Sequence, residues 1–294
     1  IPPRRPPVLP APKYSNLGTA SLYALPHQSI PIIFHTSQPL NLPPLHVHHS
    51  SMHSIYIYSP DSLYPHKSAF VANAGINISC LSWSVTPSTL PASQTLAIAG
   101  APPLSGTNIY SQSSCKNHIQ LWQLRDESKT ISCSIKSFLL HSWGNVLDLQ
   151  FSPIYPHLLG GIFQDGSFRL LKIPENWEKY VLVQTPALTI NLSKTAITCF
   201  CWYDSMSICV GCANGFIAKY NIFPNHPNQH HPNQIPTQIH KVHDSYIDKI
   251  VTSLNGLVIT HSYDCYTKIT DLNSVTIRTS TRSRCTHLYL PAHR

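Results

Sequence analysis

Histidine and cysteine side chains that could bind a metal gather at three places in the sequence. They are the cluster His46, His48, His49 and His53, the cluster His226, His230 and His231, and the pair Cys209 and Cys212. Closed zinc sites usually need four ligands on a rigid frame. Neither histidine cluster has a carboxylate or thiol partner at ligand spacing, and no second Cys-x-x-Cys pair completes a zinc ribbon. We therefore predict no metal site and no cofactor.

Serine, histidine and aspartate are all present, so hydrolase chemistry is the next possibility to test. Such a site needs a nucleophile, a base and an orienting group in one pocket. The sequence has no Gly-x-Ser-x-Gly nucleophile elbow, no phosphate-binding loop and no dinucleotide fingerprint. Its 12 acidic residues are spread thinly, which disfavours the paired carboxylates of glycoside or metal chemistry. We predict that the chain is not an enzyme and carries no catalytic residue.

The strongest regularity in the chain is a tight turn that recurs about every 50 residues. Asp165-Gly166, Asn214-Gly215 and Asp264-Cys265 each separate two short apolar runs, at intervals of 214 − 165 = 49 and 264 − 214 = 50. Asn-Gly and Asp-Gly favour positive φ, as tight hairpin turns require. A fixed period with one hairpin in each unit predicts stacked sheets, an architecture that mostly serves as a platform for partners.

Short alternating strands fill four units between about residues 69 and 290. Their first strands are expected at 78–83, 146–151, 197–202 and 247–251. The second unit is expected to close with Tyr180–Gln184, and Arg284–Tyr289 is interpreted as the first strand of a further unit. One meander cannot bury both of its faces alone, whereas radial packing of blades buries them. The fold class predicted from this pattern is an all-β propeller.

The propeller is expected to span residues 14–294. Residues 1–13 are proline-rich and are expected to be a disordered lead-in. Residues 223–240 contain a duplicated His-Pro-Asn-Gln and are expected to form a mobile loop insertion. The first residue is not Met, so we expect a fragment of a longer protein. No apolar run reaches the ~18 residues of a membrane span and no signal-peptide pattern is present, so no membrane partner is expected.

Charge and cysteine content limit the choice of partner and compartment. The net charge of +8 favours acidic partners or nucleic acid. Any DNA contact is expected at backbone phosphates and should weaken with salt. The nine cysteines are odd in number and lie mostly in strand-like segments, which fits the cytosol or nucleus. The candidates for phosphate contact are Arg125, Lys129, Lys136, Arg169, Lys172, Lys179, Lys194, Lys219, Lys241 and Lys249.

Polar residues around two of the turns resemble those of WD-repeat propellers. In that family a His before the first strand, a Ser or Thr in the second strand and an Asp in the hairpin turn form a hydrogen-bonded network. His243, Ser262 and Asp264 match these places, and His141 and Asp165 match two of them in an earlier unit. Such a network is physically sensible because buried polar groups need partners. The resemblance implies a structural network at these residues and a ring of seven blades, not all of which need lie in this chain.

Longer blocks resemble the tau-B type of propeller subunit of RNA polymerase III transcription factor IIIC. The resemblance covers about residues 69–272 and follows, in order, the blocks 70–83, 141–149, 158–169, 210–216, 243–247 and 262–264. It implies a non-enzymatic nuclear scaffold that helps the factor bind the internal B-box promoter of transfer-RNA genes. The implied partners are a second propeller subunit and the largest, DNA-binding subunit, with DNA contacted indirectly or through its phosphates. The resemblance assigns no particular residues to partner or DNA binding.

Two other functions also stay open. An unrelated WD-repeat adaptor for protein–protein interaction would have the same fold but would not associate with the polymerase III machinery. A propeller enzyme would show a metal, or a melting temperature that rises with substrate.

Overall fold

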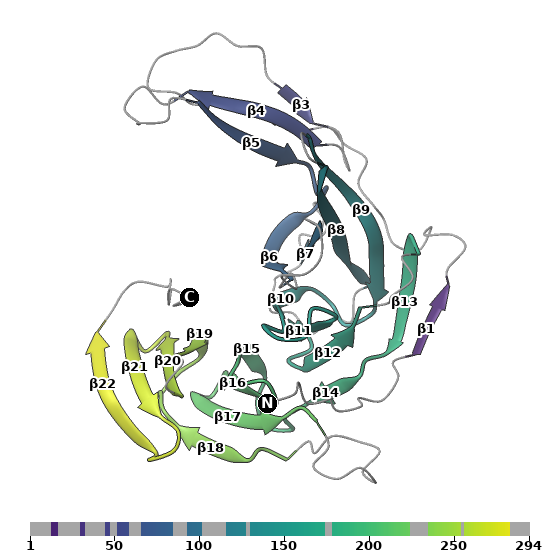
Figure 1. The fold of residues 1–294 in the computed structure, drawn as a ribbon. Coiled ribbons are helices and arrows are strands. Elements are labelled where there is room, and N and C mark those ends of the chain that lie inside the picture. Colours follow the sequence, from purple (N-terminus) through teal and green to yellow (C-terminus); the bar gives the residue numbers. More distant parts are fainter. Residues whose placement is uncertain are drawn as a thin grey trace, which may run out of the picture.

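The chain folds into short strands that form a succession of small sheets (Figure 1). The computed structural model describes residues 13–16, 30–32, 45–47, 52–58, 66–84, 93–101, 116–127, 130–173, 178–223, 235–253 and 256–282. Among these residues, no helix is long and apolar enough to cross a membrane. The fold is an all-β, WD-repeat-like propeller whose described blades follow one another along an open arc.

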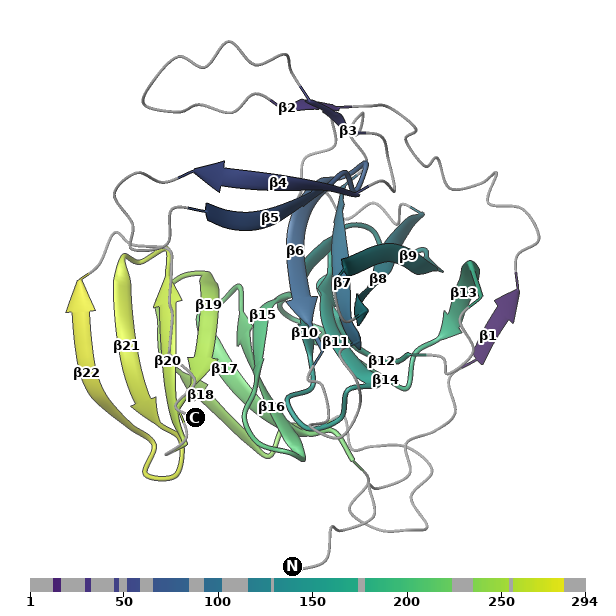
Figure 2. The same ribbon diagram turned by 45° about the horizontal axis from the view of Figure 1, so that its top comes forward.

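Four sheets of this arc start at an inner strand and continue outward; we call them blades I to IV (Figures 1 and 2). Blade I contains β6 (Asn77–Trp83), β7 (Ser93–Ala101), β8 (Asn117–Glu127) and β9 (Thr130–His141). Blade II contains β10 (Val146–Phe151), β11 (Leu158–Phe163), β12 (Phe168–Lys172) and β14 (Leu188–Ile190). Blade III contains β15 (Ile197–Trp202), β16 (Ser207–Cys212), β17 (Phe216–Asn221) and β18 (Gln238–Lys241). Blade IV contains β19 (Ile247–Thr252), β20 (Leu257–Ser262), β21 (Tyr266–Asp271) and β22 (Thr276–Arg282).

In the described part of the chain, four of the strands that precede blade I form two antiparallel pairs. They are β2 (Ile30–Ile32) with β3 (Leu45–Val47), and β4 (Met52–Tyr58) with β5 (His66–Ala72).

The inner strands repeat one local irregularity. Each inner strand pairs with the second strand of its blade, and the register of this pairing shifts near the start of the inner strand. The shifts lie across residues 78–80, 146–148, 197–199 and 247–249. A β-bulge at such a place bends the strand and increases its twist. The same bend at the same place in all four sheets shows that the units are structural repeats.

Strand β13 (Tyr180–Thr185) belongs to blade I, so the prediction of Tyr180–Gln184 as the closing strand of the second unit is wrong. It pairs in parallel with β9, and β1 (Lys13–Asn16) pairs with its other edge. Val181 and Val183 are buried in the core between blades I and II, which explains where the strand lies. Blade II is closed instead by β14, which pairs with β12.

The hydrophobic cores lie between neighbouring blades. Between blades II and III, Leu158 and Phe168 of one sheet pack with Phe200 and Val210 of the other. A Cβ at Gly160 would come 2.8 Å from the Phe200 ring, so the two sheets approach each other closely at this glycine. Each sheet therefore buries its face against the next sheet, as blade packing requires.

Hydrogen bonds also join the inner strands of successive blades. The backbone N–H of Phe151 donates to Ser82 Oγ, and Gln150 Nε2 donates to the carbonyl of Phe200, each at 2.8 Å. Thr252 Oγ1 donates to the carbonyl of Trp202, again at 2.8 Å. These bonds cross the seams between blades I and II, II and III, and III and IV, and they fix the inner strands relative to one another.

Several predicted segments fall partly outside the described residues. Of the proline-rich lead-in 1–13, only Lys13 is described, as the first residue of β1. Of the loop insertion 223–240, residues 224–234 lie outside the described part, whereas Gln238–Lys241 forms β18, so the predicted insertion runs too far. The expected strand Arg284–Tyr289 also lies outside it.

The recurring turn yields a stability prediction, because its second residue has positive φ in each of the three blades. The angles are 77° at Gly166, 81° at Gly215 and 66° at Cys265. An L-residue is strained in this region, so Cys265→Gly should stabilise the protein by about 0.5–1 kcal/mol. Chemical denaturation of the two proteins measures the difference.

Gly215→Ala provides the opposite case in the neighbouring blade. Its new Cβ would come 2.0 Å from the His243 carbonyl oxygen, so we expect a loss of about 2 kcal/mol or more. Equal stability of Cys265→Gly and the unmodified chain would show that the fourth-blade turn is not strained.

Candidate functional site

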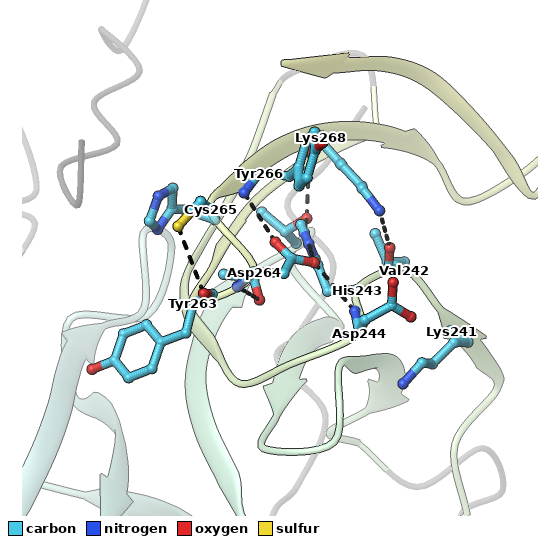
Figure 3. Close-up of polar contacts among 12 residues, drawn as sticks. Lys241, Val242, His243, Asp244, Tyr263, Asp264, Cys265, Tyr266 and Lys268 are labelled. Atoms are coloured by element: carbon cyan, nitrogen blue, oxygen red, sulfur yellow. Dashed lines mark hydrogen bonds and ion pairs between the residues drawn. The ribbon is translucent and has the colours of Figure 1, made fainter. Parts of the chain in front are cut away.

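His243 lies in the loop that leads from β18 to β19, and its side chain is fully buried (Figure 3). The backbone N–H groups of Val242 and His243 donate to the carbonyl of Gly215, at 3.1 and 3.0 Å. Gly215 occupies the tight turn of blade III, where no larger side chain would fit against the His243 carbonyl. The turn of one blade therefore fixes the loop that carries the histidine of the next.

The imidazole of His243 joins this loop to the turn of blade IV (Figure 3). Its Nδ1 lies 2.9 Å from Asp264 Oδ2, and its Nε2 lies 2.8 Å from Thr260 Oγ1. A neutral ring with its proton on Nδ1 satisfies both contacts, because it donates to the carboxylate and accepts from the hydroxyl. We call His243, Thr260, Ser262 and Asp264 the blade IV network.

Asp264 organises the turn through both of its carboxylate oxygens. Oδ1 accepts from the backbone N–H of Tyr266 at 2.9 Å, and Oδ2 accepts from that of Asp244 at 3.2 Å. Although burial opposes its charge, hydrogen bonds from His243 and these N–H groups lower the pKa of Asp264. Burial lowers the pKa of His243 despite the nearby carboxylate, which keeps the ring neutral at pH 7. The network is thus a neutral imidazole on a charged carboxylate.

Thr260 is the residue of this network that sequence reasoning missed. We predicted the strand hydroxyl at Ser262, and Ser262 Oγ does accept a hydrogen bond, from the backbone N–H of Asp264 at 3.2 Å. The hydroxyl that reaches the imidazole belongs to Thr260, two residues earlier on the same face of β20. The period-two alternation of a strand offers both positions, and the pattern alone does not choose between them.

The structure does not bring His141 and Asp165 together in the same way. Both oxygens of Asp165 are taken by Arg169, whose Nη1 and Nη2 donate at 2.9 and 2.5 Å, and Ser167 Oγ donates to the same carboxylate. The Arg169 guanidinium lies over the Trp143 ring, 4.5 Å from its centroid. Among the described residues, no hydrogen bond joins His141 to Asp165.

A different pair of residues ties the loop to the turn in blade II. The backbone N–H of Asn145 donates to Gln164 Oε1 at 2.9 Å, and the N–H of Gln164 donates back to the Asn145 carbonyl at 2.8 Å. Asn117 extends this contact into blade I by donating to Asn145 Oδ1 at 3.0 Å. The amide Gln164 therefore performs in blade II the connecting role that His243 and Asp264 share in blade IV. No sequence pattern singled it out.

His141 is instead held by aromatic rings. It stacks on Trp143 with ring centroids 5.1 Å apart, and it meets Phe163 edge to face, also with ring centroids 5.1 Å apart. The Trp143 backbone N–H approaches His141 Nδ1 at 3.4 Å, and Nε2 has no partner among the described residues. Burial, with help from nearby His118 and Arg169, lowers the pKa of His141 to about 3. The ring is neutral in the folded protein.

Several of the predicted basic and metal-binding candidates that the structure describes have structural surroundings, whereas others lie outside the described residues, namely His48, His49, Lys129, His226, His230 and His231. Arg169 is buried against Asp165, so its place among the phosphate contacts is wrong. Lys219 lies over the Tyr203 ring at 3.8 Å, whereas Lys241 is exposed and donates to the Asn214 carbonyl. Burial raises the pKa of Cys209 and Cys212 to about 12, as expected of inert core thiols. Within the described ranges no group of three or more His, Cys, Asp or Glu side chains could hold a metal.

Two characterised proteins share sequence with this chain. The transcription factor tau subunit sfc6 of Schizosaccharomyces pombe is 32% identical over 225 residues, which is 71% of this chain. The transcription factor tau 91 kDa subunit of Saccharomyces cerevisiae is 28% identical over 184 residues, or 58% of this chain. The chain belongs to the family of WD-repeat tau subunits of transcription factor IIIC.

The match covers only part of each tau subunit, 36% of the length of sfc6 and 25% of the 91 kDa subunit. No protein-family model matches the chain. Among solved structures, the WD40 domain of coronin from Toxoplasma gondii is similar, with a TM-score of 0.47 and 16% identity over 70% of this chain and 52% of that one.

The blade IV network predicts different effects for two buried threonines of this tau-family chain. Thr260→Val removes the hydroxyl that contacts the His243 ring and should destabilise the protein by about 1–2 kcal/mol. Thr270→Val is the matched control, because Thr270 is also buried and its hydroxyl has no partner among the described residues. It should be neutral or stabilising. Urea denaturation compares them, and equal losses would contradict the assigned hydrogen bond.

Because the buried His141 ring stays neutral, the folded protein should become less stable in mild acid. The pKa of this histidine is about 3 when folded and 6.5 when free, so between pH 7 and pH 5 only the unfolded chain takes up the proton. The folded state therefore loses about 2 kcal/mol from this group as the pH falls through that window. His141→Phe keeps a ring between Trp143 and Phe163 and removes the titration. Denaturation at both pH values should show a smaller loss in this variant, and an unchanged loss would contradict the neutral buried ring.

Proposed function

We propose that this chain is a non-enzymatic scaffold subunit of transcription factor IIIC, acting in the nucleus. The observation that carries the proposal is the 32% identity to the sfc6 tau subunit over 71% of the chain. The chain spans about a third of that relative, so the activity and partners of the whole protein form part of the proposal.

The chemistry of the blade IV network supports a scaffold. His243, Thr260 and Asp264 are the kinds of residue that catalyse reactions elsewhere, but here they satisfy one another's hydrogen bonds. His243 is fully buried, and its contacts join a loop to a turn within the fold. These groups stabilise the blade and leave its outer surface to bind partners.

The partners that we propose are the other subunits of the factor, in particular a second propeller and the largest, DNA-binding subunit. In this role the chain helps to assemble the part of the factor that binds the B-box of transfer-RNA genes. Its net charge of +8 would support contact with DNA phosphates inside the complex, and such contact should weaken with salt.

Affinity purification tests this proposal directly. The tagged full-length protein is expressed in its own cells, and co-purifying proteins are identified by mass spectrometry. We expect recovery of the largest subunit of transcription factor IIIC and a second propeller subunit. Neither should co-purify with a tagged, unrelated WD-repeat protein, which serves as the control. Reproducible recovery of a different set of proteins would reject the assignment and leave the fold and family unchanged.

A DNA-binding assay tests the B-box role. The factor purified with and without this subunit is titrated against a duplex that carries a transfer-RNA gene B-box, at several salt concentrations. We expect weaker binding when the subunit is absent. Equal affinity at every salt concentration would show that the subunit does not contribute to promoter binding.

A further inference from the structure

The outer edge of blade IV differs from the other blade edges. Its last strand, β22, has seven residues, and the side chains of all seven are exposed. The outer strands of blades II and III are shorter, with three and four residues in β14 and β18. Blade I has a long outer strand, β9, which pairs with β13 beyond it at Phe138–Leu140. Among the outer strands of blades I to IV, β22 is the long strand that pairs with no strand beyond it in the described part of the chain (Figure 1).

A long open edge presents a row of unpaired backbone N–H and C=O groups, which bind another strand readily. Blade I of this same chain shows that an outer edge in this fold accepts added strands. There β13 pairs with β9 in parallel, and β1 then pairs with β13 in the antiparallel sense. The geometry of a blade therefore tolerates both directions of addition.

The side chains of β22 give the open edge a chemical character. Residues that lie opposite each other in an antiparallel pair share one face of the sheet. Arg282 lies opposite Tyr266, and Ser280 lies opposite Lys268, so these side chains share one face. After the register shift, Ile277 joins the same face opposite Thr270, and it is 48% exposed. This face offers the apolar side chain of Ile277 at one end and the basic side chains of Lys268 and Arg282 at the other, with Lys268 Nζ also donating to the Val242 carbonyl at 2.8 Å.

The charge on this edge is one-sided. Strand β22 contains two arginines, Arg278 and Arg282, and no Asp or Glu. Arg278 is paired with Asp271 at 2.6 Å, but Arg282 contacts no carboxylate among the described residues. An added strand with carboxylates near Arg282 and an apolar side chain near Ile277 would be complementary to this face. Each favourable cross-strand pair would contribute to binding.

From this edge we infer that β22 is a docking site for an extended, acidic segment of a partner protein, which adds to blade IV as a further strand. Main-chain hydrogen bonds would supply affinity, and the face of Ile277, Ser280 and Arg282 would supply specificity. A duplex nucleic acid fits less well, because strand addition needs a row of peptide groups from the partner. The inference does not rest on the assignment to transcription factor IIIC.

Three synthetic peptides of about eight residues test the site. The first alternates glutamate with valine, the second replaces each glutamate by lysine, and the third has prolines that remove central N–H donors. Binding to the whole chain is followed by fluorescence anisotropy and by amide hydrogen exchange. We expect the acidic peptide to bind and to slow exchange in β22, and the other two to bind roughly tenfold more weakly or not at all.

Two arginine variants complete the test. Arg282→Glu should weaken binding of the acidic peptide by roughly tenfold, because attraction becomes repulsion. Arg125→Glu changes an exposed arginine of blade I, whose Nε donates to Gln123 Oε1, and should leave binding unchanged. Melting curves confirm that both variants fold. No binding of the acidic peptide, protection of another strand, equal effects of the two variants, or protection of β22 by duplex DNA instead would each overturn the inference.

Discussion

The structure depends on the contact between the inner strands of neighbouring blades. A sheet of four short strands has two faces and cannot bury both alone, so each blade needs the next one. The bonds that Ser82, Gln150 and Thr252 make across three successive seams hold the inner strands in one relative position. The hydrophobic cores lie along the same seams, where Phe200 packs against Phe168. Hydrogen bonding and apolar burial thus stabilise the same arrangement of blades.

The polar networks depend on this arrangement because they connect one blade to the next. Gly215 of blade III accepts two hydrogen bonds from the loop that carries His243 into blade IV. In blade II, Gln164 and Asn145 make the corresponding tie by a different route, with Asn117 of blade I attached to it. The two arrangements have the same effect, because each provides hydrogen-bond partners for the buried loop that leads into an inner strand. Histidine is therefore one way to hold this loop, and an amide is another.

The repeat could be predicted from the sequence because one or two residues at each turn indicate its backbone geometry. Gly166 and Gly215 adopt the positive φ that their Asp-Gly and Asn-Gly pairs indicate, and Cys265 adopts it without a glycine. The sequence did not predict β13, because Val181 and Val183 show that the strand is apolar but not which sheet receives it. It also did not predict that Arg169 would occupy Asp165 and leave His141 to the aromatic rings. Such choices depend on side chains that meet only after the blades have packed.

Native-state hydrogen exchange would test the central role of the seams most directly. Strands β10 and β15 have a described blade on each side, whereas β6 and β19 have one on a single side. If packing between inner strands stabilises the fold, amides of β10 and β15 should exchange slowest, those of β6 and β19 faster, and those of β22 fastest. Protection that is equal in all four inner strands, or that follows strand length alone, would contradict the account.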